Sequence, residues 1–132
     1  MPVRSFPHRA SSVSDARQFV AQALTLLPPE ISEKARLLVS ELATNALLYS
    51  AGSFKVSATY SSNERVVRIG VTDGGGGQPR VDRPDSTEEH GRGLQLVAAF
   101  SDRWWVERLA RVPGKTVWVE LLPAEPGPVR AV

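Results

Sequence analysis

The stretch Glu41-Leu42-Ala43-Thr44-Asn45 lies in the middle of a helical pattern that covers about residues 31–50. At 3.6 residues per turn, Glu41 and Asn45 project from the same side of this helix, about 40° apart around its axis. They border an apolar stripe that contains Ile31, Ala35, Leu38, Val39, Leu42, Ala46 and Tyr49. A carboxylate and a carboxamide at the edge of a buried stripe lose hydration, and this costs free energy unless they find partners. The pair therefore marks either the solvated edge of a core helix or a binding site.

The size and composition of the chain predict one domain. Its 132 residues suffice for one hydrophobic core and are too few for two. We expect the domain over residues 1–122 and a disordered tail over 123–132. No apolar run approaches the ~20 residues that a membrane span needs, and the N-terminus lacks the apolar segment of an export signal. Since the chain has no cysteine, disulfides and thiolate metal sites are excluded, and we expect a cytoplasmic protein without membrane contact.

The charge of the chain argues against a nucleic-acid partner. The formal net charge is only +2, and the basic residues are spread along the chain instead of forming a stripe. We therefore expect no direct contact with nucleic acid. His8 and His90 are the only histidines, and without a spaced cluster of further ligands they do not predict a zinc site.

Three helices are predicted from apolar residues at helical spacing. The first begins near Ser12, which can cap it, and ends before the two prolines at 28–29. The second covers about residues 31–50, with Gly52 as its expected C-terminal cap. The third is short and follows Gly93.

The other segments alternate between apolar and polar residues with a period of two, as half-buried strands do. We expect a short edge strand over 3–7 and further strands over 54–60, 67–73, 104–109 and 116–122. Together with the three helices, these strands predict an α+β two-layer sandwich. Its sheet should be mixed, mainly antiparallel, and covered on one face by the three helices.

Asp73 ends one of the predicted strands and is followed by four glycines at 74–77. It has the same parity as Val67, Ile69 and Val71, so it should point to the apolar side of the sheet. An ionised Asp only accepts hydrogen bonds, and an amino group on a planar ligand would satisfy it. The alternative is a plain glycine-rich loop between a strand and the next segment.

Gly91, Arg92 and Gly93 precede the predicted short helix. A helix start offers free N–H groups and a positive dipole end, which is the physical basis of phosphate binding, although many helices begin after a glycine. The preceding segment, 78–90, has one large aliphatic residue and two prolines. We expect it to be exposed and mobile.

Taken in chain order, these stretches resemble the boxes of the GHKL family of ATP-binding domains, which have the Bergerat fold. Glu41-x-x-x-Asn45 is similar to the N box, and Asp73-x-Gly75-x-Gly77 is similar to the first glycine box. Gly91-Arg92-Gly93-Leu94 is similar to the second glycine box, and Gly114-Lys115-Thr116 to the closing box. The resemblance extends over roughly residues 12–122.

The resemblance implies a role for each box in binding ATP and Mg²⁺. Asn45 would coordinate Mg²⁺, and Glu41 would orient or deprotonate the attacking hydroxyl. Asp73 would accept a hydrogen bond from the adenine amino group, with Thr116 in support. The nucleotide would also be bound by Gly75, Gly77, Gly91, Arg92, Gly93 and Leu94, with residues 78–90 as the ATP lid.

Within this family, the chain is most similar to the bacterial anti-sigma-factor serine/threonine kinases. The resemblance implies a protein that phosphorylates an antagonist (anti-anti-sigma) protein, sequesters a sigma factor, or does both. A homodimer remains open as a further assembly. The alternative function is a module that binds a partner and responds to nucleotide but transfers no phosphate. Glu41 favours the kinase, because binding alone does not require it.

Overall fold

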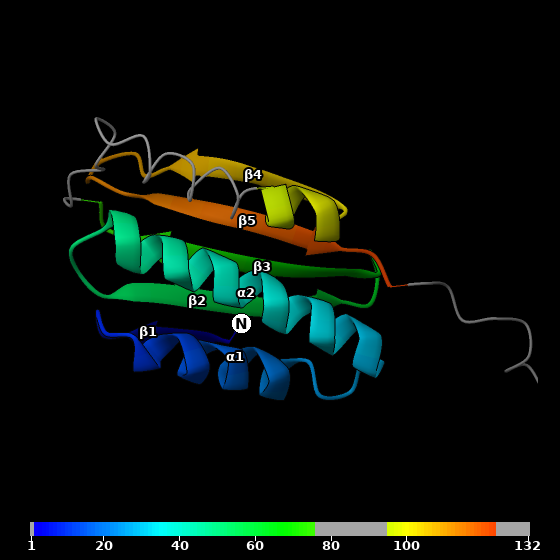
Figure 1. Cartoon of the computed structure of the whole chain (residues 1–132). Helices are drawn as coiled ribbons and strands as arrows, with labels where there is room; N and C mark the ends of the chain where they lie inside the picture. Colours follow the sequence, from blue (N-terminus) through cyan, green and yellow to red (C-terminus); the bar gives the residue numbers. More distant parts are fainter. Residues whose placement is uncertain (1, 76–94, 124–132) are drawn as a thin grey trace, which may run out of the picture.

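The computed structural model of the chain describes residues 2–75 and 95–123. In this part the order is β1 (Val3–Phe6), α1 (Ser11–Ala23), α2 (Pro29–Tyr49), β2 (Phe54–Ser61), β3 (Val66–Asp73), β4 (Arg103–Arg108) and β5 (Lys115–Leu121). A further helical segment covers residues 95–100. The helices form one layer in front of the sheet (Figure 1), so the predicted α+β sandwich is confirmed.

The sheet has five strands in the order β1-β2-β3-β5-β4, with β3 at its centre. All four strand pairs in the described part are antiparallel, as the mainly antiparallel prediction requires. Val71 lies between Val56 of β2 and Val117 of β5. Asp73 is opposite Phe54 on one side and Lys115 on the other. The alternation of side chains therefore gives β3 one apolar face, and the strand ends at the acidic residue Asp73.

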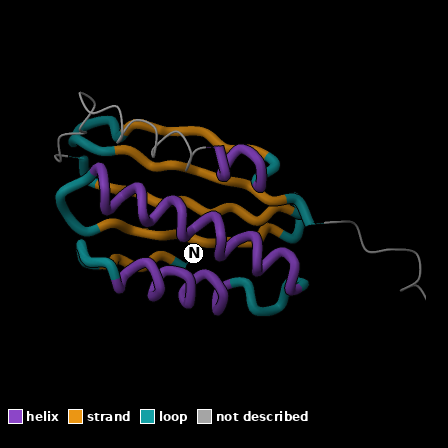
Figure 2. The backbone as a smooth tube through the Cα atoms, in the orientation of Figure 1, coloured by secondary structure: helices purple, strands orange, loops and turns teal. Residues whose placement is uncertain are grey.

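The hydrophobic core consists of side chains from the helices and from one face of the sheet. Figure 2 shows the backbones of these two layers. Burying these side chains removes apolar surface from water, which is the main favourable term in folding. The helices contribute Ala16, Val20, Leu24, Leu38, Val39, Leu42 and Ala46, and the strands contribute Phe54, Val56, Val67, Ile69, Val119 and Leu121. Val97 of the short helical segment is also fully buried, so this segment packs on the same layer.

Helix α2 begins at Pro29, two residues before the predicted start at about residue 31. Pro29 occupies the first turn, where its missing N–H has no helical partner in any case. Pro28 has the extended backbone, φ −57° and ψ 148°, that a residue before proline favours. The helix runs for 21 residues and buries one stripe against the sheet. Asn45 lies beside this stripe and is only partly exposed.

Both predicted helix caps are wrong. The Ser12 hydroxyl does not cap α1 but donates a hydrogen bond of 2.6 Å to the carbonyl of Pro7. It thus ties the helix to the loop after β1. Helix α2 ends with Ser50 in an extended conformation, and among the described glycines only Gly75 and Gly114 have positive φ. Gly52 therefore does not form the left-handed cap.

The opposite face of the sheet is polar and aromatic. A Cβ at Gly70 would lie 2.5 Å from the Trp118 ring, so this ring lies directly on the glycine of β3. Trp118 stacks on Trp105 at 6.3 Å, and its indole N–H donates to Glu107. Large aromatic rings thus fill the space that a glycine leaves in the middle of a strand.

No helix within residues 2–75 or 95–123 has the length and apolar composition that crossing a membrane requires.

Candidate functional site

A pocket lies between α2 and the ends of β3, β4 and β5. Its walls are aliphatic, and Asn45, Tyr49, Asp73 and Lys115 bring polar groups to it. Apolar walls with a few convergent polar groups are typical of small-molecule sites. The cavity volume is only ≈ 50 Å³, far below the ~300 Å³ at which ligand pockets begin. A nucleotide must therefore open the pocket or extend beyond it.

Asp73 is the central acidic group of the site. It is 4% exposed and lies at the end of β3, on the helix side that its parity predicts. Its Oδ1 accepts the backbone N–H of Gly75 at 2.9 Å, and its Oδ2 accepts the ammonium of Lys115 at 2.8 Å. A buried carboxylate needs such partners, because desolvation without them is costly. The prediction that Asp73 faces the buried side is confirmed.

Two glycines shape the backbone beside Asp73. Gly75 has φ +65° and Gly114 has φ +126°, and both values favour glycine. A Cβ at Gly114 would lie 2.4 Å from the carbonyl oxygen of Asp73. A Cβ at Gly75 would lie 3.1 Å from the Gly114 nitrogen. The backbone segments at Gly75 and Gly114 therefore approach more closely than a Cβ would permit. This close approach lies beside the hydrogen bond from the Gly75 N–H to Asp73.

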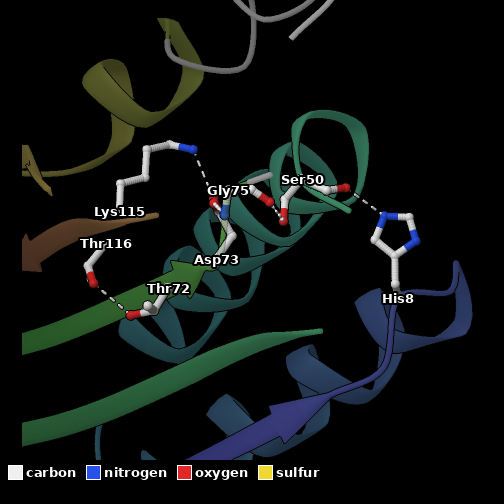
Figure 3. A network of polar contacts seen from close by, with 7 residues as sticks. All are labelled: His8, Ser50, Thr72, Asp73, Gly75, Lys115 and Thr116. Atoms are coloured by element: carbon white, nitrogen blue, oxygen red, sulfur yellow. Dashed lines mark hydrogen bonds and ion pairs between the residues drawn. The ribbon is translucent and has the colours of Figure 1, made fainter. Parts of the chain in front are cut away.

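Lys115, and not Thr116, supports Asp73. The Thr116 hydroxyl lies 2.7 Å from the Thr72 hydroxyl, on the face of the sheet away from the helices. Lys115 lies opposite Asp73 in the ladder, and its ammonium bonds the carboxylate. Figure 3 shows the two contacts side by side. The expectation that Thr116 supports Asp73 is therefore corrected, because Lys115 makes the contact with Asp73.

Asn45 and Glu41 have different positions relative to the pocket. Asn45 lines it, whereas Glu41 is half-buried one helical turn earlier on α2 and does not. Within the described residues, neither side chain has a hydrogen bond or ion pair to another residue. In this part of the chain, Asn45 therefore brings an unpaired carboxamide to the pocket, and Glu41 has an unpaired carboxylate one helical turn earlier on α2.

The rest of the predicted nucleotide site lies outside the described residues. This applies to Gly77, Gly91, Arg92, Gly93 and Leu94, to the lid over 78–90 and to the tail after residue 123. For these residues the roles implied by the resemblance remain predictions.

The donor set of the pocket fits Mg²⁺ held jointly with a nucleotide. The described residues contain no group of three or more His, Cys, Asp or Glu side chains that could hold a metal ion by themselves. Mg²⁺ is usually bound by one or two protein oxygens together with substrate phosphates and water. The Asn45 carboxamide at the pocket would supply one such oxygen.

A polar chain connects the pocket to the N-terminal segment (Figure 3). The Nε2 of His8 lies 2.9 Å from the carbonyl oxygens of both Leu47 and Ser50. Because carbonyls accept, Nε2 carries the proton and shares it between them. Ser50 donates from its hydroxyl to the Gly75 carbonyl at 3.4 Å. Through Gly75 this chain reaches Asp73.

Sequence reasoning missed Lys115, Tyr49 and Val106 as residues of the pocket. A signal for Lys115 was present in the alternation of its strand. Lys115 has the same parity as Val117, Val119 and Leu121, which face the core. Thr116 has the opposite parity.

An antiparallel sheet covered by helices on one face, with Asn45 and Asp73 at a shared pocket, agrees with the resemblance to ATP-binding domains. The chain matches the family model described as a histidine kinase-like ATPase domain over residues 6–121, and it belongs to this family. None of the curated proteins matches the chain. Membership of this family indicates that the protein binds ATP.

Proposed function

We propose that this protein is an ATP-dependent regulatory kinase of the type it resembles, the bacterial anti-sigma-factor kinases. With Mg²⁺-ATP it phosphorylates a serine or threonine of an antagonist protein, sequesters a sigma factor, or does both. The observation that carries the proposal is the convergence of Asn45 and Asp73 on one pocket, with Glu41 one helical turn from Asn45.

Each side chain has a distinct task in this reaction. Asp73 accepts hydrogen bonds from the base, and the Asn45 oxygen would hold Mg²⁺, which when bound would supply neutralisation of the phosphate charge. Glu41 accepts the proton of the attacking serine or threonine hydroxyl. The hydroxyl oxygen bonds to the γ-phosphorus, the bond from that phosphorus to the bridging oxygen breaks, and ADP leaves. Since a carboxylate on a helix next to the metal ligand can take this proton, the chain supplies both groups from α2.

A second candidate function is a module that binds a partner and responds to nucleotide without transferring a phosphate. The observation in its favour is that Glu41 does not line the pocket that Asn45 and Asp73 share. In this second function, the half-buried Glu41 carboxylate has no catalytic role and only keeps the edge of α2 hydrated.

A set of three variants distinguishes the two candidates. Glu41→Gln preserves size and polarity but removes the basic oxygen, so phosphate transfer should fall ~10²–10⁴-fold while ATP affinity stays within a few-fold. Asn45→Ala should lose metal-dependent ATP binding and transfer together. Glu33→Gln, on the exposed side of the same helix, is the matched control and should change neither.

The measurements are calorimetry with ATP in the presence and absence of Mg²⁺, and transfer of radiolabel from ATP to the protein that wild type captures from its source cell. If wild type binds ATP and its partner but labels nothing, the kinase proposal is wrong and the binding module is the better description. If Glu41→Gln loses ATP binding and stability together, Glu41 is a structural residue of α2.

A further inference from the structure

The ion pair between Asp73 and Lys115 is a feature that the proposed ATP site does not yet use. Both residues line the pocket, and the ammonium lies 2.8 Å from Asp73 Oδ2. The Lys115 side chain is 27% exposed and the Asp73 side chain 4%. The carboxylate is therefore sealed on the protein side, and the lysine remains open to a ligand.

The pair also retains hydrogen-bonding capacity. An ammonium has three N–H donors, and one of them is used on Asp73. Within residues 2–75 and 95–123 the other two have no acceptor on another side chain or on the backbone. A carboxylate has about four lone-pair sites, and Asp73 uses one on Gly75 and one on Lys115. The pocket thus presents an acceptor directly beside a donor.

A bound base has two ways to reach Asp73. It can displace Lys115, or it can bind to the pair as it stands. Displacement replaces a charge-assisted hydrogen bond with a weaker one to a neutral amino group. It also leaves a charge without its partner in a site of low dielectric, and removing one partner of a buried pair is strongly unfavourable. Binding to the intact pair avoids both costs.

We propose that Lys115 is a second base-reading residue, which donates to the ring edge beside the atom that Asp73 accepts. This inference rests on the proposed ATP site and concerns its selectivity. A 6-aminopurine presents an amino donor next to the N1 acceptor, so the amino group pairs with Asp73 and N1 pairs with Lys115. A 6-oxopurine presents an acceptor next to the N1–H donor, and the flexible lysine pairs with its oxygen while Asp73 pairs with N1–H.

The consequence is a site that binds both classes of purine nucleotide. Asp73 alone would discriminate against a 6-oxopurine, because two acceptors would then face each other. An unpaired polar group in a buried site reduces affinity by about ten-fold or more. With Lys115 present, both ring edges find complementary partners, and this discrimination is small.

The test compares ATP with inosine triphosphate, which carries the 6-oxo edge without the additional 2-amino group of guanine. Calorimetry on wild type in Mg²⁺ should give dissociation constants within about ten-fold of each other. In Lys115→Met, which keeps the side-chain length and removes the donors, the preference for ATP should increase at least about ten-fold. Lys55→Met is the matched control, because Lys55 is an exposed lysine at a position of β2 that faces away from the helices, and its preference should equal that of wild type.

The outcomes separate this inference from the proposed function. If wild type binds ATP and discriminates against inosine triphosphate by much more than ten-fold, Lys115 does not read the base. The same conclusion follows if Lys115→Met has the preference of wild type. If wild type binds neither nucleotide, the ATP site itself is wrong and the inference falls with it. The wild-type comparison needs no variant, so a strong preference for ATP overturns the inference even if Lys115→Met does not fold.

Discussion

Asp73 and Glu120 are two carboxylates in the same sheet that are equally buried and differently surrounded. Each is 4% exposed, and each is paired with basic side chains. Asp73 lies on the helix side, with one lysine, one backbone N–H and an aliphatic pocket beside it. Glu120 lies on the opposite face between two arginines, Arg68 at 2.6 Å and Arg103 at 3.4 Å.

The comparison shows that burial and a cationic partner do not by themselves mark a ligand site. Both carboxylates satisfy that description, yet Asp73 and not Glu120 lines the pocket to which Asn45 also contributes. Glu120 is enclosed by arginine side chains that close over it. We therefore interpret Asp73 as a binding residue and Glu120 as a structural one.

The largest expected difference between the two carboxylates is in nucleotide affinity. Asp73→Asn converts a charged acceptor into a neutral amide and should weaken ATP binding by about ten-fold or more. Glu120→Gln is the matched substitution on the other face and should leave ATP affinity within about two-fold. Calorimetry at one Mg²⁺ concentration measures both. Equal losses in the two variants would contradict the assignment of Asp73 to the base.

A smaller effect is expected for stability, and here the substitution of Glu120 is the one that matters. Glu120→Gln removes the negative charge and one of the two acceptor oxygens that pair with the arginines, and it should lower the free energy of unfolding by about 1–2 kcal/mol. The loss stays below that of a fully buried pair because the Arg68 and Arg103 side chains are 36% and 70% exposed. Urea unfolding measures the change. A stability equal to that of wild type would show that the arginines contribute nothing through Glu120.

The hydrogen bond that Arg68 donates to Glu120 raises the pKa of Arg68 above its ordinary value, with the charge of Glu120 as a further cause. A raised pKa stabilises the fold below the ordinary pKa of the group, and this contribution is lost only as the pH rises through the folded value. For an arginine that region is strongly alkaline. The stability lost in Glu120→Gln should therefore not vary around neutral pH on account of Arg68.

The smallest effect is expected for Arg103, the outer partner of Glu120. Its side chain is 70% exposed, and it also lies over the Trp105 ring at 5.5 Å. Exposed ion pairs and exposed cation–π contacts each contribute under about 1 kcal/mol. Arg103→Met keeps the aliphatic contact and should change the unfolding free energy by about 0.5 kcal/mol or less. A loss as large as that of Glu120→Gln would mean that Arg103, and not Arg68, is the main partner.

The sequence alone predicted the layers, the strands and the side of the sheet on which Asp73 lies. These depend on periodicity, which is local and follows directly from helix and strand geometry. The alternation of Val67, Ile69 and Val71 was sufficient to place Asp73. Asn45 was placed in the same way, because one face of α2 had to pack on the sheet.

The partner of Asp73 was not predicted, because a cross-strand contact depends on the register between two strands. Lys115 and Asp73 are 42 residues apart and meet only through the pairing of β3 with β5. The resemblance to the closing box indicated Thr116, whereas the parity of β5 favours Lys115. Here the family resemblance and the alternation of β5 indicate different residues on the helix side of the sheet, and the alternation agrees with the structure. The caps failed for a related reason, since Ser12 found a closer acceptor in Pro7.

The hydrogen-bonded chain from His8 to Asp73 has a consequence for the kinetics of folding. Its tertiary links and the adjoining Asp73–Lys115 ion pair close long loops, with sequence separations of 42 for His8 and Ser50, 25 for Ser50 and Gly75, and 42 for Asp73 and Lys115. Contacts between residues far apart in sequence pay their loop-closure entropy before they contribute stability, so they form slowly. We expect the helices and the β2–β3 hairpin to form early and this end of the molecule to assemble late. The pocket beside Asp73 would then be completed after the sheet and helices that carry it.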